Sequence, residues 1–157
     1  MFVAKVENTV ANIALVTDGK RLTAAYLCIP KFPQGGTSWM SPAPLADGKA
    51  ALTARRGVIL GEASFSGDSA TGKVTVAGGS RSFSADLAKG YAGLYRTTSG
   101  EAGKTGSSET GWIVLPDGGV CGVTNLNVPG GGFKSEPAPS KPEGDGHITN
   151  FANPYSQ

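Results

Sequence analysis

The chain has 157 residues, of which 24 are glycine and 10 are proline, and only 17% are charged. This length fits a single domain with a core of its own, and the abundance of turn-forming residues is typical of a β protein. The 14 basic and 12 acidic residues give a net charge of +2 with no long basic run. That distribution argues against nucleic acid as a partner.

Short strands are predicted along residues 1–126, separated by turn signals rather than by helical segments. Glycine, asparagine and aspartate tolerate the positive φ that tight hairpin turns need. The turn signals follow one another at Asp18-Gly19, Asp47-Gly48, Gly67-Asp68, Gly78-Gly79 and Asp117-Gly118. Their spacing leaves no room for the crossover helices of a parallel sheet, so we expect an antiparallel one.

The first strands show the alternation of a half-buried sheet. Residues 2–6 place apolar side chains at every second position, and residues 11–16 form a second apolar strand. After the first turn, residues 22–28 alternate again, which predicts a β-hairpin. The positions expected to share a face are Phe2, Ala4 and Val6 in the first strand and Leu22, Ala24, Tyr26 and Cys28 in the third.

The strand pattern breaks between Pro30 and Asp47. Four prolines lie in this stretch, and proline cannot donate to a sheet ladder, so we expect a loop or an interrupted edge strand. The favoured interpretation of the pair Trp39-Met40 within it is core filling, and the alternative is an exposed contact patch or a lid over a barrel mouth.

Strand character resumes after residue 50 and continues to residue 126. In residues 82–87, Phe83, Ala85 and Leu87 are expected to point into the core. About ten strands in one open sheet would leave long exposed edges, which closure into a barrel or folding into a sandwich removes. Because successive hairpins favour a meander, we predict an all-β antiparallel meander closed as a barrel, with a sandwich as the alternative.

The composition changes after residue 126. Residues 127–157 are rich in proline and glycine and are predicted to form an extended arm attached to a domain of residues 1–126. The arm ends in the apolar residues Ile148, Phe151 and Tyr155, and it is either a frayed terminus or a docking element. The predicted partner-binding residues are these three together with Trp39 and Met40.

The two cysteines, Cys28 and Cys121, lie far apart in apolar strand-like runs. They are too few for a structural zinc site. One interpretation is a pair of buried free thiols. The other is a single disulfide between an early strand and the last one, which would place the protein outside the cytoplasm.

No motif predicts a catalytic, metal-binding or cofactor-binding residue. Residues 67–74 approach a phosphate-binding loop, but Val74 occupies the hydroxyl position and a strand follows instead of a helix. The single histidine, His147, lies in the arm. Among the carboxylates, Glu62 and Asp86 are the candidates for a hydrolase that works with two acidic groups.

Membrane-spanning and targeting segments are not expected in this chain. Its apolar runs are far shorter than the roughly 18 to 20 residues of a spanning helix. Residues 2–16 are interrupted by Lys5 and Glu7 and lack the regions of a signal peptide.

Three segments resemble small, largely uncharacterised secreted or lipid-anchored β proteins of actinobacteria. They are IALVTDGK (13–20) with AAYLC (24–28), AGLYR (92–96) and GWIVLPDG (111–118). The resemblance implies an extracytoplasmic or cell-envelope location and no established activity. The chain departs from it by the missing leader and by Cys121.

The leading functional hypothesis is a non-enzymatic β-scaffold that acts through protein contacts, with a protein partner or a second copy, and uses the arm for docking. The alternative is a carrier that holds a small ligand or lipid inside the barrel. The second alternative is the hydrolase with Glu62 and Asp86.

Overall fold

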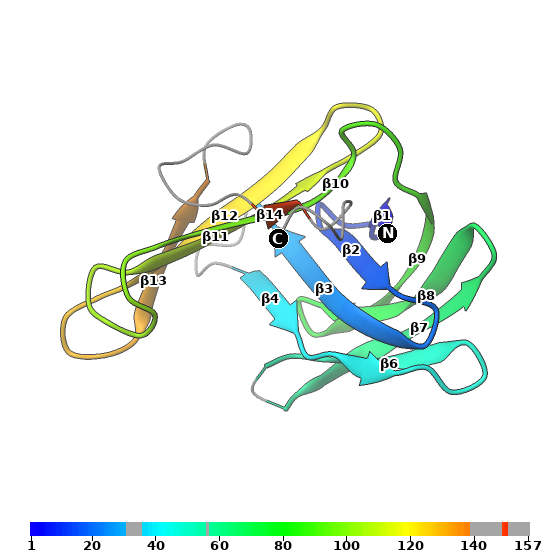
Figure 1. Ribbon diagram of the computed structural model, residues 1–157, viewed down its shortest axis with the longest axis horizontal. Coiled ribbons are helices and arrows are strands. Elements are labelled where there is room, and N and C mark those ends of the chain that lie inside the picture. The colour runs from blue at the N-terminus through cyan, green and yellow to red at the C-terminus, as the bar shows by residue number, and fades with distance from the viewer. Residues whose placement is uncertain (31–35, 56, 139–148, 151–157) are drawn as a thin grey trace.

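The computed structural model describes residues 1–30, 36–55, 57–138 and 149–150. These residues contain fourteen strands, which form two antiparallel sheets (Figure 1). None of them forms a helix, so no described segment provides a membrane-spanning helix.

The larger sheet forms a nearly closed, eight-stranded barrel. Its strand order is β4-β3-β2-β1-β9-β8-β7-β6, and the short β5 (Ala43–Pro44) pairs with β3. The eight strands are β1 (Phe2–Lys5), β2 (Asn12–Thr17), β3 (Arg21–Ile29), β4 (Gly36–Met40), β6 (Lys49–Thr53), β7 (Ile59–Ser66), β8 (Ser69–Val76) and β9 (Gly79–Leu87). The pairing of β1 with β9 joins the two ends of this meander.

Only a few backbone contacts close the barrel between its two edge strands, β4 and β6. A bridge pairs Met40 with Ala54, and the Ser41 amide donates to the Thr53 carbonyl at 2.8 Å. The predicted all-β antiparallel barrel is confirmed. The barrel uses eight strands, however, and the later strands form a sheet of their own.

The inside of the barrel is filled with apolar side chains. Phe2, Ala4 and Val6 all lie in this core, as the alternation of β1 predicted. Phe83 and Ala85 of β9 are buried there too, and Leu87 packs against them. The predicted inward face of residues 82–87 is therefore confirmed.

The second sheet packs against the outside of the barrel (Figure 1). Its order is β13-β12-β11-β10-β14, with β10 (Gly93–Ser99), β11 (Ser108–Val114), β12 (Val120–Asn127), β13 (Phe133–Pro137) and β14 (Thr149–Asn150). A second apolar core lies between the two sheets. Its members are Val3, Ala14, Tyr26, Cys28 and Trp39 from the barrel strands, and Ala92, Leu94, Ile113, Leu115, Cys121 and Val123 from the second sheet and its flanking residues.

Strand β3 is buried on both faces, which corrects the expected face of this strand. Leu22 lies inside the barrel, whereas Tyr26 and Cys28 face the second sheet. The pairing of β2 with β3 shifts register between Val16 and Thr17, and such an irregularity turns the side chains that follow to the other face.

The hairpin turns lie close to their predicted positions. At residues 46–49, Asp47 and Gly48 have φ values of 50° and 73° and form the tight connection between the paired residues Ala46 and Lys49. The predicted turn at Gly78-Gly79 is wrong by one residue, because Ala77 and Gly78 have the positive φ values and Gly79 already pairs with Val76.

The proline-rich segment forms the interrupted edge strand that was one of the two expectations. Strand β4 pairs with β3 over residues 36–40, and β5 resumes the pairing nearer the start of β3. Two pieces of the predicted arm also form strands. Strand β13 pairs with β12, and β14 pairs with β10, so they extend the second sheet at both edges. The division at residue 126 stays a prediction.

Candidate functional site

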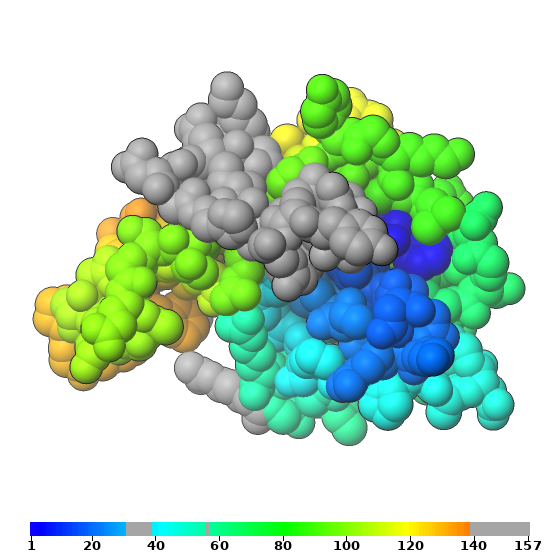
Figure 2. Space-filling view, in the orientation of Figure 1, coloured from blue at the N-terminus to red at the C-terminus, as the bar shows by residue number. Residues whose placement is uncertain are grey.

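The second sheet extends past the barrel (Figure 1). A cleft of about 710 Å³ lies between this extension and the end of the barrel. One wall is formed by the end of the barrel around Trp39, Arg55 and Val58. The other is formed by β10, β11 and the loop between them, together with β12 and β13. The space-filling view shows a notch between the projecting part of the second sheet and the barrel (Figure 2). Its volume falls in the range of ligand pockets.

An aromatic pair lies beneath the cleft. Trp39 of β4 and Tyr26 of β3 are directly opposite each other in the sheet, and their ring centroids are 4.5 Å apart. Gly111 of β11 packs against both rings. A Cβ at this position would lie 2.7 Å from Tyr26 Cζ and 3.0 Å from Trp39 Cζ2. The glycine therefore lets β11 approach the pair closely and fixes the ring of Trp39 at the base of the cleft.

A charged group lies against Trp39. Glu109 of β11 accepts a hydrogen bond from Arg55 Nη1 at 3.2 Å and forms an ion pair with Arg96, whose Nε lies 2.7 Å from Oε1. The guanidinium carbons of Arg55 and Arg96 lie 5.7 and 5.5 Å from the ring centroid of Trp39, within the range of a cation–π contact. One carboxylate thus serves two guanidinium groups, so these three side chains carry a net charge of +1.

The edge of the cleft exposes apolar side chains. Val58 and Phe133, which line it from opposite walls, are 58% and 52% exposed. Ile59, next to Val58, is 73% exposed. Large exposed apolar groups gathered beside a concave surface are typical of a binding site.

The wall formed by β12 and β13 is held by polar side chains that bind one another. Asn127 Nδ2 donates to Ser107 Oγ at 2.8 Å, and Ser135 Oγ donates to Asn125 Oδ1 at 2.6 Å. These bonds join neighbouring strands and the loop before β11. They fix the shape of this wall before any ligand arrives.

The predicted partner-binding residues are not brought together in the described part of the chain. Trp39 lines the base of the cleft but is only 8% exposed and packs in the core between the two sheets, as the core-filling interpretation predicted. Met40 is only 4% exposed and packs inside the barrel, so its predicted place on an exposed contact patch is wrong. Successive residues of a strand point to opposite faces, which separates the pair. Ile148, Phe151 and Tyr155 lie outside the described residues.

Sequence reasoning missed the charged residues of the cleft. Arg55 belongs to an isolated basic pair, Arg96 to a short strand, and Glu109 is one of several free acids in the body of the chain. No local spacing connects them, because they come from three separate elements. Only the packing of β11 against β4 brings them to one ring.

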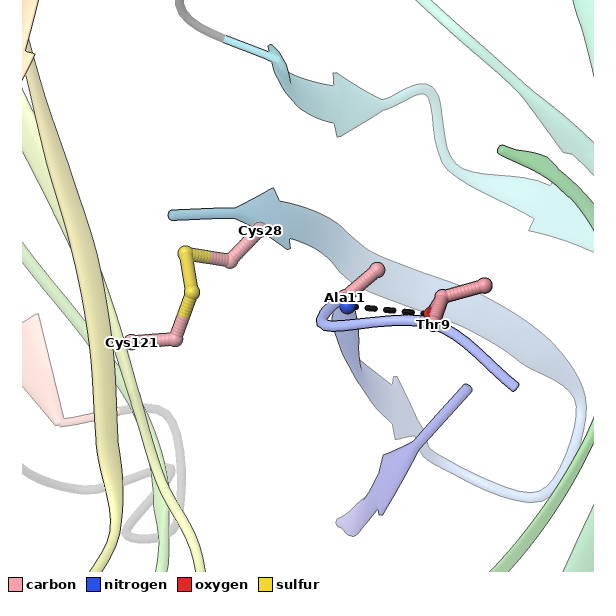
Figure 3. The surroundings of a disulfide bond; sticks show 4 residues. All are labelled: Thr9, Ala11, Cys28 and Cys121. Carbon is pink, nitrogen blue, oxygen red and sulfur yellow. Dashed lines mark hydrogen bonds between the residues drawn. A yellow bond between two sulfur atoms is a disulfide. The ribbon is translucent and has the colours of Figure 1, made fainter. Parts of the chain in front are cut away.

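A disulfide joins the barrel to the second sheet (Figure 3). Cys28 of β3 and Cys121 of β12 are bonded, with their Cα atoms 6.1 Å apart, and both are almost completely buried. Of the two interpretations of the cysteines, the structure thus contains the disulfide. It crosses the interface between the two sheets and anchors the strand that forms one wall of the cleft.

The candidate hydrolase residues lie apart. Glu62 pairs with Lys73 and Asp86 pairs with Ser69, and both carboxylates are exposed. Their partners in β8, Ser69 and Lys73, are four positions apart, which is roughly 13 Å along the strand. Catalytic carboxylate pairs lie no more than about 9.5 Å apart. Within the described ranges, no cluster of three or more His, Cys, Asp or Glu side chains is placed to hold a metal ion.

No family model, no curated protein and no solved structure matches this chain. The resemblance to actinobacterial envelope proteins therefore stays a prediction.

Proposed function

We propose that this protein is a non-enzymatic binding module that holds an extended segment of a partner protein in the cleft between its two sheets. The observation that supports this proposal is the combination of an open cleft, an exposed apolar edge and a fixed charged base. Apolar contacts supply most of the affinity in such interfaces, and a few charged groups supply specificity.

The filled interior of the barrel weighs against the carrier alternative. Phe2, Leu52 and Phe83 are buried there among other apolar side chains, at the positions where a carrier needs space. A barrel of about eight strands has an interior that side chains can fill completely. We therefore place the ligand outside the barrel.

An extracytoplasmic location is part of the proposal. Disulfides persist in oxidising compartments and are rare in the cytoplasm, and Cys28–Cys121 is the feature that supports this location. The docking role of Ile148, Phe151 and Tyr155 in the arm remains a separate prediction.

Selection from a random peptide library tests the proposal. The full chain is the target, and the selected peptides are then measured by fluorescence anisotropy against two variants. Phe133→Ser removes an apolar group of the cleft, and Val10→Ser removes a similarly exposed side chain that does not line it. We expect Phe133→Ser to weaken the peptides by about tenfold, the loss of roughly 1.4 kcal/mol of apolar contact, and Val10→Ser to leave their affinity unchanged.

Three outcomes would contradict the proposal. The library yields no binder, the binders are equally sensitive to both variants, or the chain forms a dimer that Phe133→Ser dissociates. The last result would assign the cleft to a second copy of this chain. Analytical ultracentrifugation of the wild type and of the variant distinguishes it from the others.

A further inference from the structure

Arg55 is the charged group of the cleft that is most open to a ligand. Its side chain is 52% exposed, against 35% for Arg96 and 23% for Glu109. Its contacts with the Glu109 oxygens are 3.2 and 3.4 Å long, whereas the contact between Arg96 and Glu109 is 2.7 Å. Arg55 thus binds Glu109 through two hydrogen bonds, whereas Arg96 Nε pairs with it by charge alone.

From this geometry we propose that Arg55 binds an acidic side chain, aspartate or glutamate, of a peptide held in the cleft. The inference rests on the proposed peptide-binding function and adds the chemistry of the recognised group. Among the described residues that line the cleft, the charged ones are Arg55, Arg96 and Glu109, so one positive charge is left over. A ligand carboxylate would balance it.

The ring of Trp39 prepares Arg55 for this contact. It lies against the guanidinium group, whose Nη1 and Nη2 atoms donate to Glu109, so a ligand carboxylate would bind through the remaining N–H hydrogens of the fork. A guanidinium edge matches the two oxygens of a carboxylate, and stacking on an aromatic ring restricts its motion. Lysine has the same charge but neither the flat fork nor the stacking surface, so it is a diagnostic replacement.

The neighbours of Arg55 define the remainder of the ligand. Val58 and Phe133 are exposed within the same cleft and offer contacts to apolar groups. The cleft therefore favours an acidic residue flanked by apolar ones. Capture of a C-terminal carboxylate typically uses a nest of backbone amides, whereas the donor here is a side chain, so we assign the carboxylate to an internal acidic residue.

Three capped peptides test the inference by NMR titration of the full chain. They are Ac-Leu-Glu-Leu-NH₂, its Gln analogue Ac-Leu-Gln-Leu-NH₂, and Ac-Leu-Gln-Leu-OH, which has only a C-terminal carboxylate. The signals followed are the Arg Nε–H groups and the Trp39 indole. We expect the Glu peptide to bind about fivefold more tightly than the Gln peptide, as a partly exposed ion pair provides, and to lose this advantage in 300 mM salt.

Variants assign the effect to Arg55. The preference for Glu should disappear in Arg55→Gln and in Arg55→Lys and persist in Arg21→Gln, which removes an exposed arginine that does not line the cleft. The amide spectra of the variants should overlay with the wild type away from the cleft, since Arg55 is half exposed.

The outcomes separate the two proposals. Equal binding of all three peptides at the cleft would overturn recognition of a carboxylate and leave the peptide-binding function intact. If Ac-Leu-Gln-Leu-OH binds more tightly than Ac-Leu-Glu-Leu-NH₂, the choice of an internal acidic residue is overturned. If Arg55→Lys still prefers the Glu peptide over the Gln peptide, the proposed role of the Arg55 guanidinium geometry is overturned. Absence of any shift in the cleft up to millimolar peptide would count against both proposals.

Discussion

Removal of the disulfide should lower the free energy of unfolding by an amount set by the loop that it closes. Cys28 and Cys121 are 93 positions apart. The chain-entropy relation gives about 4.6 kcal/mol at 25 °C for a loop of that length, and measured losses are typically about 2 to 4 kcal/mol. A domain is stable by only about 5 to 15 kcal/mol. We therefore expect the reduced protein to fold but to be clearly less stable.

Urea unfolding monitored by tryptophan fluorescence measures this loss. The protein is reduced in denaturant, because the buried disulfide is shielded from thiols in the native state, and it is refolded with the reductant present. The oxidised and reduced chains contain the same side chains, so their difference reports the cross-link. A Cys28→Ala/Cys121→Ala variant is the control for the packing of the two sulfur atoms. A difference below about 0.5 kcal/mol between oxidised and reduced protein would refute the reasoning.

The position of the disulfide adds a local expectation. It ties β12 to β3, whereas the hairpin of β7 and β8 lies within the barrel sheet and is held by its own pairing. Amide hydrogen exchange of the reduced protein should accelerate more in β10–β12 than in β7–β8. Equal acceleration in both groups would show that the sheets open together, which contradicts a local role for the cross-link.

Two further predictions concern single positions. Gly111→Ala should lower the free energy of unfolding by about 1 to 3 kcal/mol, because the added Cβ would lie 2.7 Å from Tyr26 Cζ. Gly79→Ala is the control: its Cβ would meet only the end of the flexible Arg81 side chain, so this variant should be neutral or stabilising. Equal urea midpoints for the two variants would contradict this expectation. The second position is Asp18. The backbone amides of Lys20 and Arg21 donate to Asp18 Oδ1 and hold the pKa of the Asp18 carboxyl below its usual value. The resulting stabilisation is present above about pH 4 and is lost as pH falls through the lowered pKa, so the stability gap between wild type and Asp18→Asn should shrink between pH 6 and pH 2, and a constant gap would be evidence against the lowered pKa.

The sequence by itself determined the local features of the fold. Positive φ at Gly19 and Gly48 follows from the residue types at these tight turns. The alternation of apolar and polar residues that places Phe83 and Ala85 inside the barrel is likewise visible in the local sequence. Both signals act over a few positions, so no knowledge of the rest of the chain is needed to interpret them. Together they were enough to predict an all-β antiparallel barrel.

Tertiary structure decided which strands close the barrel and what gathers on its outside. Strand β3 is apolar on both faces, and only the presence of a second sheet explains why. The same packing bonds Cys28 to Cys121 and places Arg55, Arg96 and Glu109 around Trp39. These contacts join residues far apart in the chain, and their formation depends on the register of several strands at once. A shift of one residue would turn each side chain to the opposite face, so the cleft exists only once the two sheets are in place.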